Sequence, residues 1–420
     1  MTHLCLFEDA RVHHLRPLID MRAVYQLRPG MFTLLDATRL LLNSFPVVLH
    51  SRPDVASIVA TATGLSVNRL PVEAPVVFVN GRYLAEAGPV AHLIAALFEP
   101  SATEQVLVQG DDVIAARVHR PHPDLLQRPS LELDAFADLQ RQPVAGARLI
   151  SRLWHLIDEV RPALVRDART CERQPARWDA TGLELGTGAI LAARERIFIG
   201  VGVHISHGAI LNATHGPIVL DDESSVLEGA IVRGPVYIGK RATVRARAEV
   251  EGSSIGPGCK VGGEVSDVIM HAHANKGHAG FLGHSYIGKW CNLGAGTNVS
   301  NLRNDYGEVA LYNAYLEAFE PSGRQFLGVF MGDHTKLGIQ SMVNTGSVFG
   351  VSCNLFGAGY LERHVPSFSW GGPLSGLEPY RIDKALRVAE VMMARRNLHM
   401  TADERVRLQA LCRIAHSVQA

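Results

Sequence analysis

A six-residue repeat in the second half of the chain constrains its fold more than any other feature. Between about residues 183 and 372, a large apolar side chain returns at every sixth position. If about one residue in three is large and apolar, one run of six arises by chance roughly once in 700 trials, so three runs in one segment indicate a true repeat. The runs are Leu220, Val226, Val232, Ile238, Val244 and Val250; Phe281, Ile287, Leu293 and Val299; and Met331, Leu337, Val343, Phe349, Leu355 and Leu361.

This period predicts a left-handed parallel β-helix, called the prism below. Three short strands make one triangular coil of about 18 residues, and one aliphatic side chain on each side points into a narrow interior. Glycine often follows the aliphatic residue, as at Gly239 and Gly288, and its lack of a Cβ atom permits a tight corner. Small residues such as Ala242 and Ala248 would fit where neighbouring sides approach. The alternative is an antiparallel sandwich with accidental spacing.

The repeat is interrupted in two places. Residues 300–326 lack it and are predicted to leave the prism as a loop, and loops on rigid scaffolds often carry function. The segment Ile269–His284 keeps the spacing but holds polar residues, and Asn275 is expected to point inward. Residues 376–420 return to a helical pattern. Its two apolar stripes are Ile382, Ala385, Leu386, Ala389, Met392 and Met393, and then Leu408, Leu411 and Ile414.

The first half has the pattern of an α/β domain. Short apolar runs at 45–49 and 74–79 predict buried strands, and helical spacing appears at 34–42 and 90–98. We therefore expect an α/β domain over residues 1–128, which the family resemblance given below identifies as nucleotidyltransferase-like, and a helical connector and linker over 129–182. The prism would follow over 183–372, and C-terminal helices over 373–420.

Composition and charge exclude several classes of protein. The chain has 41 Lys and Arg against 41 Asp and Glu, so it lacks the basic excess of a dedicated nucleic-acid binder. No apolar run approaches the ~18 residues that cross a bilayer, and the first ten residues do not resemble a signal peptide. The six cysteines form no CxxC pair. We expect free thiols, a cytoplasmic location, and neither nucleic-acid nor membrane partners.

Four histidines, at positions 271, 273, 278 and 284, form a cluster in the sequence. They could be surface residues, metal ligands or a general base. His273 and His278 have the spacing of two zinc ligands in γ-class carbonic anhydrases, but the positions 36 residues upstream are Tyr237 and Ala242, so the ligand set is incomplete and we expect no metal. A neutral histidine can instead take a proton from an incoming amine or hydroxyl group.

The sequence around these histidines resembles a known family. Lys276–Gly283, Tyr286–Thr297 and then Asn301 resemble the acetyltransferase half of the bacterial bifunctional UDP-N-acetylglucosamine pyrophosphorylase/glucosamine-1-phosphate N-acetyltransferases. The resemblance implies a left-handed β-helix acyltransferase that uses acetyl-CoA and forms a homotrimer, with the acyl donor between adjacent prisms. It assigns the residues as follows: His278 as catalytic base, Asn292 and Asn301 at the amino sugar or acetyl donor, Ala295 in the acetyl-CoA groove, and Gly332 and Asp333 on the coenzyme side.

Two features of that family are altered here. Its tyrosine after the histidine is Phe281, and its sugar-phosphate lysine falls near Ser266 or Asp267. Arg245 and Arg247 could bind the phosphate from another direction, or lie on a solvated face.

The whole chain resembles a variant branch of that family, often described as a sugar nucleotidyltransferase. The marks are Phe7-Glu-Asp9, Leu15–Leu18, Arg22, Leu27–Met31, Asn80-Gly-Arg82, Gly262-Gly-Glu264, Asn275–His278, Met331–His334, Pro366–Gly372 and Tyr380–Lys384. The resemblance implies a sugar-nucleotidyltransferase domain at the N-terminus. Such domains open with a glycine-rich phosphate loop, but the segment Leu6–Pro17 contains no glycine.

Arginines would then have to replace the glycine loop. Arg22 and Arg28 are predicted to bind phosphate, with Gly30 serving a turn and Mg2+ as a possible cofactor, although these arginines could also be structural salt-bridge partners. The sequence thus predicts an acetyl-CoA-dependent N-acetyltransferase that acts on an amino-sugar phosphate or a nucleotide amino sugar. The alternatives are a sugar-1-phosphate nucleotidyltransferase and a non-catalytic trimeric scaffold that binds sugar nucleotides.

Overall fold

The computed structural model describes residues 1–70 and 74–419, which form two compact units. The first unit comprises Met1–Leu15, Ile19–Leu27 and Phe32–Arg152. The second comprises Arg16–Leu18, Arg28–Met31 and the described chain from Leu153 onward. No described helix is both long and apolar enough to cross a membrane. All six cysteines are buried free thiols, as predicted.

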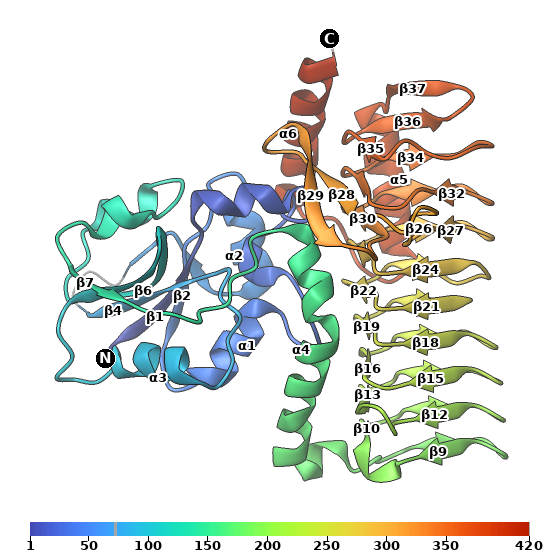
Figure 1. The fold of residues 1–420 in the computed structure, drawn as a ribbon, viewed down its shortest axis with the longest axis horizontal. Helices are drawn as coiled ribbons and strands as arrows, with labels where there is room; N and C mark the ends of the chain where they lie inside the picture. Colours follow the sequence, from blue (N-terminus) through green and yellow to red (C-terminus); the bar gives the residue numbers. More distant parts are fainter. Residues whose placement is uncertain (71–73, 420) are drawn as a thin grey trace. The chain divides into compact units, whose positions relative to one another are not determined.

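The first unit is built on one seven-stranded sheet (Figure 1). The strands lie in the order β3-β2-β1-β4-β6-β5-β7; the first four are parallel, β6 is antiparallel to both neighbours, and β7 is parallel to β5. Their bounds are β1 His3–Phe7, β2 Val47–Leu49, β3 Ser66–Val67, β4 Val76–Asn80, β5 Gln105–Gln109, β6 Asp112–Val118 and β7 Gln140–Pro143. The helices are α1 Leu34–Leu41, α2 Ala56–Thr63 and α3 Pro89–Ala96.

The elements of the first unit follow from its local sequence. Every residue of β4 is buried, as expected for a central strand with both faces covered. Helix α1 is capped by the preceding Thr33, whose hydroxyl accepts a hydrogen bond from the backbone N–H of Asp36. Both predicted strands and both predicted helices are confirmed, with bounds that differ from the predicted ones by at most two residues.

The predicted helical connector over 129–182 differs from the structure in its first half. Residues 129–152 belong to the first unit, where β7 pairs with β5, and Leu131 and Phe136 join its core. Helix α4, Leu153–Arg173, starts only where the second unit does. Leu153, Leu156, Ile157 and Val160 form an apolar stripe on this helix, whereas the short strand β7 before it has no apolar period.

The second unit contains the predicted prism. Its three parallel sheets are called face 1, with nine strands, face 2, with eleven, and face 3, with eight (Figure 1). Face 1 consists of β10 Ile197–Ile199, β13 Ile218–Leu220, β16 Val236–Ile238, β19 Ser254–Ile255, β22 Ile269–Met270, β25 Tyr286–Ile287, β30 Val329–Met331, β33 Ser347–Phe349 and β35 His364–Val365.

Face 2 consists of β8 Glu184–Leu185, β11 His204–Ile205, β14 Ser225–Val226, β17 Thr243–Val244, β20 Lys260–Val261, β23 Asn275–Lys276, β26 Asn292–Leu293, β31 Lys336–Leu337, β34 Asn354–Leu355, β36 Ser369–Gly372 and β37 Gly376–Pro379. The last strand, β37, pairs with β36 in antiparallel fashion. Face 3 consists of β9 Ile190–Ala192, β12 Ile210–Asn212, β15 Ile231–Arg233, β18 Glu249–Glu251, β21 Glu264–Ser266, β24 Phe281–Gly283, β27 Asn298–Val299 and β32 Met342–Val343.

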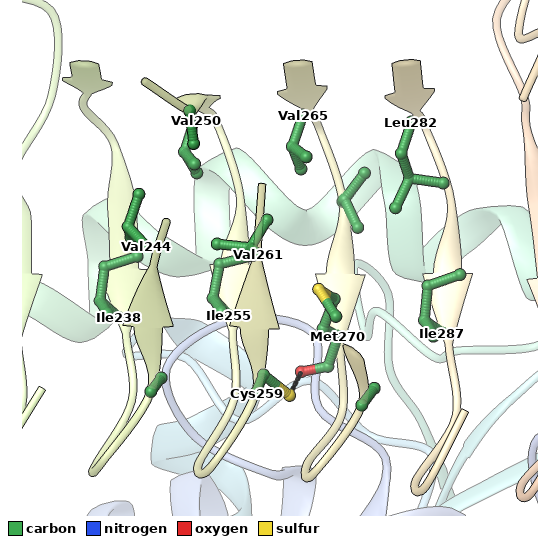
Figure 2. Packing of buried hydrophobic residues seen from close by; sticks show 14 of the residues in the cluster. Ile238, Val244, Val250, Ile255, Cys259, Val261, Val265, Met270, Leu282 and Ile287 are labelled. Carbon is green, nitrogen blue, oxygen red and sulfur yellow. Dashed lines mark hydrogen bonds between the residues drawn. The ribbon is translucent and has the colours of Figure 1, made fainter. Parts of the chain in front are cut away.

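The prism interior is one continuous apolar cluster, part of which is seen in Figure 2. Coils vary in length: Val219 pairs with Tyr237, eighteen residues on, whereas Ser254 pairs with Ile269, fifteen residues on. Two inward positions differ from the prediction. Leu282 replaces Phe281 in the interior, and Lys276 is buried, with 1% exposed, while Asn275 is only partly buried.

The corner glycines serve a different purpose from the one predicted. A Cβ atom on Gly256 would lie 1.9 Å from the carbonyl oxygen of His271 in the next coil, so glycine is required by the close approach of two backbones. The left-handed backbone conformation falls two residues later, for example at Gly258 with φ 66° and at Trp290, two after Gly288, with φ 61°.

The predicted excursion is a hairpin of β28, Val309–Asn313, and β29, Ala318–Arg324. The chain then rejoins the stack, because β25 pairs directly with β30. Two C-terminal helices follow, α5 Ile382–Ala394 and α6 Ala402–Gln419. The buried side of α5 consists of Ala385, Leu386, Ala389 and Met393, which belong to the predicted apolar stripe.

Candidate functional site

Several of the predicted site residues share one corner of the prism. His278 lies in the turn from β23 on face 2 to β24 on face 3, and its side chain is exposed. Ala295 lies in the same turn of the following coil, where the N–H of Gly296 donates to the carbonyl oxygen of Ala279 at 3.1 Å. Arg245 and Arg247 lie in this turn two coils earlier, and both are exposed. The corner between faces 2 and 3 therefore brings the predicted base, two cations and the predicted acyl-donor segment together.

Lys276 supports this corner from inside the prism. Its Nζ donates to the carbonyl oxygen of His278 at 2.7 Å and to that of Gly262 at 3.0 Å. Burial lowers the pKa of Lys276 to about 8. The six-residue pattern calls for an aliphatic residue between Met270 and Leu282, so a lysine at this position is a sequence signal for a special role that the predictions from sequence did not include.

The coil below His278 has a shortened corner. Gly262 and Gly263 alone join β20 to β21, whereas four residues join β17 to β18 in the previous coil. Gly263 has φ 74°, and a Cβ atom there would meet the carbonyl oxygen of Gly280 at 2.5 Å. This explains the Gly262-Gly-Glu264 mark: only glycine allows the shortened turn directly next to His278.

Asn292 lies on the outside of face 2. Lys260, Asn275, Asn292 and Lys336 succeed one another in register on adjacent strands. The Nδ2 of Asn275 donates to Oδ1 of Asn292 at 2.7 Å. These four side chains and helix α5 line a cavity of about 590 Å³.

Asn301 is placed at a different corner, with His284. The Nδ2 of Asn301 lies 2.9 Å from Nδ1 of His284, whose Nε2 is 3.8 Å from the carboxylate of Asp267. The ring of His284 stacks on Phe326 with centroids 5.4 Å apart. Burial lowers the pKa of His284, and Asp267 opposes this shift. This corner joins faces 3 and 1, so the structure does not bring Asn292 and Asn301 together within one chain.

The other two histidines lie apart from His278. His271 is buried, and His273 stacks on Trp290 with ring centroids 4.4 Å apart. Burial lowers the pKa of His273 to about 4, helped by nearby Lys289. Within residues 1–70 and 74–419, no three His, Cys, Asp or Glu side chains converge as a metal site would require.

Gly332 and Asp333 lie at the corner between faces 1 and 2. Asp333 is buried, and its Oδ1 accepts a hydrogen bond from the backbone N–H of Lys289 at 2.9 Å. A Cβ atom on Gly332 would approach Gly350 in the next coil to 2.8 Å. In this chain both residues hold successive coils together, and they are not at the corner of His278.

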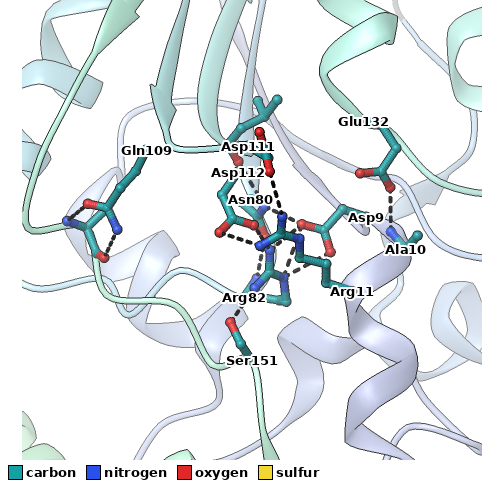
Figure 3. A network of polar contacts seen from close by, with 12 residues as sticks. Asp9, Ala10, Arg11, Asn80, Arg82, Gln109, Asp111, Asp112, Glu132 and Ser151 are labelled. Carbon is teal, nitrogen blue, oxygen red and sulfur yellow. Dashed lines mark hydrogen bonds and ion pairs between the residues drawn. The ribbon is translucent and has the colours of Figure 1, made fainter. Parts of the chain in front are cut away.

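In the first unit, the polar residues of the Phe7-Glu-Asp9 and Asn80-Gly-Arg82 motifs take part in buried polar contacts. Asp9, Asn80 and Arg82 form one network (Figure 3). Asp9 follows β1, and Asn80 and Arg82 end or follow the adjacent parallel strand β4. Nε of Arg82 donates to Asp9 at 2.9 Å, its Nη1 donates to Ser151 at 2.6 Å, and its Nη2 also pairs with Asp112. Ligands of open parallel sheets usually bind at this carboxyl edge, which is here occupied by ion-paired side chains.

A second buried pair lies at the same edge. Nη1 of Arg52 donates to Oε1 of Glu8 at 2.6 Å, and the backbone N–H of Val24 donates to the same oxygen at 2.7 Å. Burial raises the pKa of Glu8, while Arg52 opposes this shift. The Phe7-Glu-Asp9 mark is therefore the acidic half of two buried ion pairs.

The two arginines predicted to bind phosphate are both buried. Arg22 belongs to the first unit and is 2% exposed, whereas Arg28 belongs to the second and is 8% exposed. Arg28 bonds to the carbonyl oxygen of Met31, and its backbone N–H donates to the hydroxyl of Tyr286 at 3.3 Å. These contacts hold the segment of Arg28 against face 1.

Gly30 also has a structural role that differs from the predicted turn. A Cβ atom on Gly30 would lie 2.7 Å from Cβ of Ala163 and 2.7 Å from the carboxylate of Asp167, both on α4. Its carbonyl oxygen accepts a hydrogen bond from the hydroxyl of Ser254 at 2.6 Å. Glycine is required here because the segment passes between α4 and face 1.

Comparison with known proteins finds similarity to two kinds of transferase. A family model described as sugar nucleotidyl transferase matches residues 4–175. The uncharacterized acetyltransferase YaiX of Escherichia coli is 27% identical over 199 residues, which cover 47% of this chain and 84% of that protein. The bifunctional protein GlmU of Methylococcus capsulatus is 29% identical over 193 residues, which cover 44% of this chain and 38% of that protein.

Solved structures with detectable similarity include two acyltransferases. The polySia specific acetyltransferase NeuO is 11% identical, with 48% of this chain and 87% of that chain covered and a TM-score of 0.24. The UDP-N-acetylglucosamine acyltransferase of Francisella novicida is 13% identical, with 56% and 77% covered and a TM-score of 0.26. The sequence matches indicate that the chain is a transferase, as predicted.

Proposed function

We propose that the protein transfers an acetyl group from acetyl-CoA to the amine of an amino-sugar phosphate or a nucleotide amino sugar. The observation that carries this proposal is the corner of His278, where an exposed imidazole lies between Arg245 and Arg247 on one side and Ala295 on the other. The arginines supply charge for an anionic acceptor, since guanidinium groups bind phosphate in a bidentate manner. The relatives named acetyltransferase and GlmU support the same reaction class.

His278 would act as the general base. The attacking nitrogen forms a bond to the thioester carbonyl carbon and gives its proton to the imidazole, and the bond from carbon to sulfur then breaks. The departing thiolate takes this proton from the imidazolium, so the products are an amide and a free thiol, and the imidazole base is regenerated. Imidazole is the side chain most often used for this role near neutral pH. Lys276 holds the His278 backbone in place from behind.

The test is His278→Ala in the full chain, with thiol release measured over a panel of amino-sugar phosphates and nucleotide amino sugars. Loss of general-base help should reduce turnover by about 10²–10⁴ and leave acetyl-CoA affinity nearly unchanged. His215→Ala, at another exposed histidine of the prism, is the matched control and should retain turnover. Full turnover in His278→Ala, together with loss of turnover in His284→Ala, would show that His284, at the corner between faces 3 and 1, is the general base instead.

A homotrimer is part of this proposal. Ile339 is 73% exposed, and its neighbour Gln340 donates its backbone N–H to the carbonyl oxygen of Ala295 at 2.7 Å. An exposed large aliphatic residue beside the candidate acyl-donor segment fits a surface that a second prism covers. Light scattering at micromolar concentration should give three times the mass of one chain, and a monomer would argue against a shared donor site.

Nucleotidyl transfer by the first unit is the second candidate, favoured by the family-model match. The cofactor implied for that reaction is Mg2+, which binds carboxylates and phosphates. Glu8, Asp9 and Asp112 at the sheet edge are already paired with Arg52 or Arg82, so these residues do not fit a Mg2+ site. We therefore expect no pyrophosphate release from nucleoside triphosphates and sugar 1-phosphates. Such release would make the first unit catalytic.

A further inference from the structure

The cavity between face 2 and helix α5 contains an unusual concentration of positive charge. Five of its ten lining residues are cations, and no acidic residue lines it. Its volume, about 590 Å³, lies within the range of small-molecule sites. The cations are Lys260 and Lys336 on face 2 and Arg387, Arg395 and Arg396 on or just after α5.

The acidic residues of α5 do not neutralise this charge. Asp383 pairs with Arg381, and Glu390 pairs with Arg405. Among the described residues, none of the five cavity cations forms an ion pair with a carboxylate. Lys336 and Arg396 are half-buried, and cations in such positions are usually paired or bind an anion, whereas Lys260, Arg387 and Arg395 are exposed.

Two of the cations are held in place by backbone oxygens. Nζ of Lys336 donates to the carbonyl oxygen of His334 at 2.7 Å, and Nη1 of Arg396 donates to that of Gly258 at 2.6 Å. Burial lowers the pKa of Lys336 to about 8. Burial also lowers the pKa of Lys260, and Arg396, Arg245 and Arg395 act in the same direction. A bound anion would relieve this repulsion.

The remaining lining residues describe the rest of a ligand. Asn275 and Asn292 present carboxamides whose orientation is set by the hydrogen bond between them. Val388, Val391 and Met392 form an apolar strip along α5, and Val391 is 58% exposed. Such a site suits a molecule with clustered phosphates and an adjacent apolar or aromatic group.

We propose that this cavity binds the diphosphate group of a phosphorylated small molecule. The binding itself does not depend on the reaction proposed above. The identification of the ligand as a reactant does rest on that proposed function. In that case the diphosphate belongs either to coenzyme A or to a nucleotide amino sugar, since both carry one.

The experiment is calorimetric titration of the full chain with inorganic pyrophosphate, without divalent metal and at low ionic strength. We expect saturable binding by the wild type. The double variant Arg387→Gln/Arg395→Gln should weaken it about a hundredfold, because each lost charge-assisted hydrogen bond is worth about tenfold in affinity. Lys384→Gln, on the same helix but outside the cavity, removes one charge and should change the affinity by less than about threefold.

Two results would overturn the proposal: no binding of pyrophosphate by the wild type, or similar weakening by Lys384→Gln and the double variant. Competition then separates the sources. Displacement of pyrophosphate by coenzyme A but not by UDP assigns the cavity to the donor, and the reverse assigns it to the acceptor. His278→Ala should bind pyrophosphate like the wild type, so failure of the acyl-transfer proposal and failure of the cavity proposal give different results.

Discussion

The cations at the sheet edge of the first unit and those in the cavity under α5 differ in their partners. Arg82, which is fully buried, has two carboxylates and a hydroxyl as partners. Lys336 in the second unit has a carbonyl oxygen. A cation with a complete set of anionic partners supports the fold, whereas a cation without them costs stability that a ligand can restore. The difference distinguishes structural arginines from candidate ligand-binding cations.

The largest effect is expected where the partners are complete. Arg82→Ala leaves Asp9 and Asp112 without their shared cation, and breaking a buried ion pair costs about 3–5 kcal/mol of the free energy of unfolding. Urea denaturation measured by a signal from the first unit would show it. Arg387→Ala, an exposed and unpaired arginine, should stay within about 0.5 kcal/mol of the wild type. Equal losses of stability in the two variants would contradict the distinction between paired structural arginines and unpaired cavity cations.

The second effect is a pH dependence that comes from Lys276. Its pKa is lowered from 10.5 to about 8 in the folded chain, so between these values the unfolded chain holds more protons. The free energy of unfolding must therefore rise with pH across this interval. The contribution of Lys276 amounts to about 2–3 kcal/mol by pH 10.5.

The measurement is urea denaturation from pH 7 to 10.5 of the wild type and Lys276→Met. Other groups titrate in both proteins, so the difference between the two curves isolates the lysine. We expect the wild type to gain on the variant as the pH rises. Parallel curves would mean that Lys276 stays protonated in the folded chain.

The smallest effect is an increase in stability, opposite in sign to the loss expected for Arg82→Ala. Replacing Lys336 by Met removes a partly buried cation without a carboxylate, and should raise the free energy of unfolding by about 1–2 kcal/mol at pH 7. Thermal unfolding in phosphate-free buffer would show the gain. A loss of stability would mean that the bond from Lys336 to the backbone outweighs the cost of its charge.

The sequence predicted the prism well because one apolar side chain at every sixth position marks each residue that points into the interior. Where the prediction was wrong, at Phe281 and Asn275, the strands are two or three residues long and a shift of one residue exchanges inside for outside. The first half of the predicted connector was wrong for a related reason. Strand β7, Gln140–Pro143, has partly or fully exposed residues and owes its place to pairing with β5, a long-range contact without a local signal.

The candidate site was only partly accessible from sequence. Motif resemblance pointed to His278, and the structure places Arg245, Arg247 and Ala295 at the same corner. The sequence could not reveal the cavity, because Lys260 and Arg395 are far apart along the chain and come together only when α5 lies on face 2. Nor did the sequence show that Arg22 and Arg28 are buried, since buried arginines and arginines that bind ligands look alike in a sequence.

The hairpin of β28 and β29 has a consequence for how this chain can vary in length. Tyr286 pairs with Phe330 as directly as other neighbours in the stack, although more than forty residues separate them. The pairing of β25 with β30 therefore does not depend on the length of the chain between these two strands. Loop closure becomes only slowly more costly as a loop grows, by about 0.6 kcal/mol for each doubling. At this point the chain can lengthen or shorten without shifting any inward side chain, so new surface can be added here while the spacing of the prism is preserved.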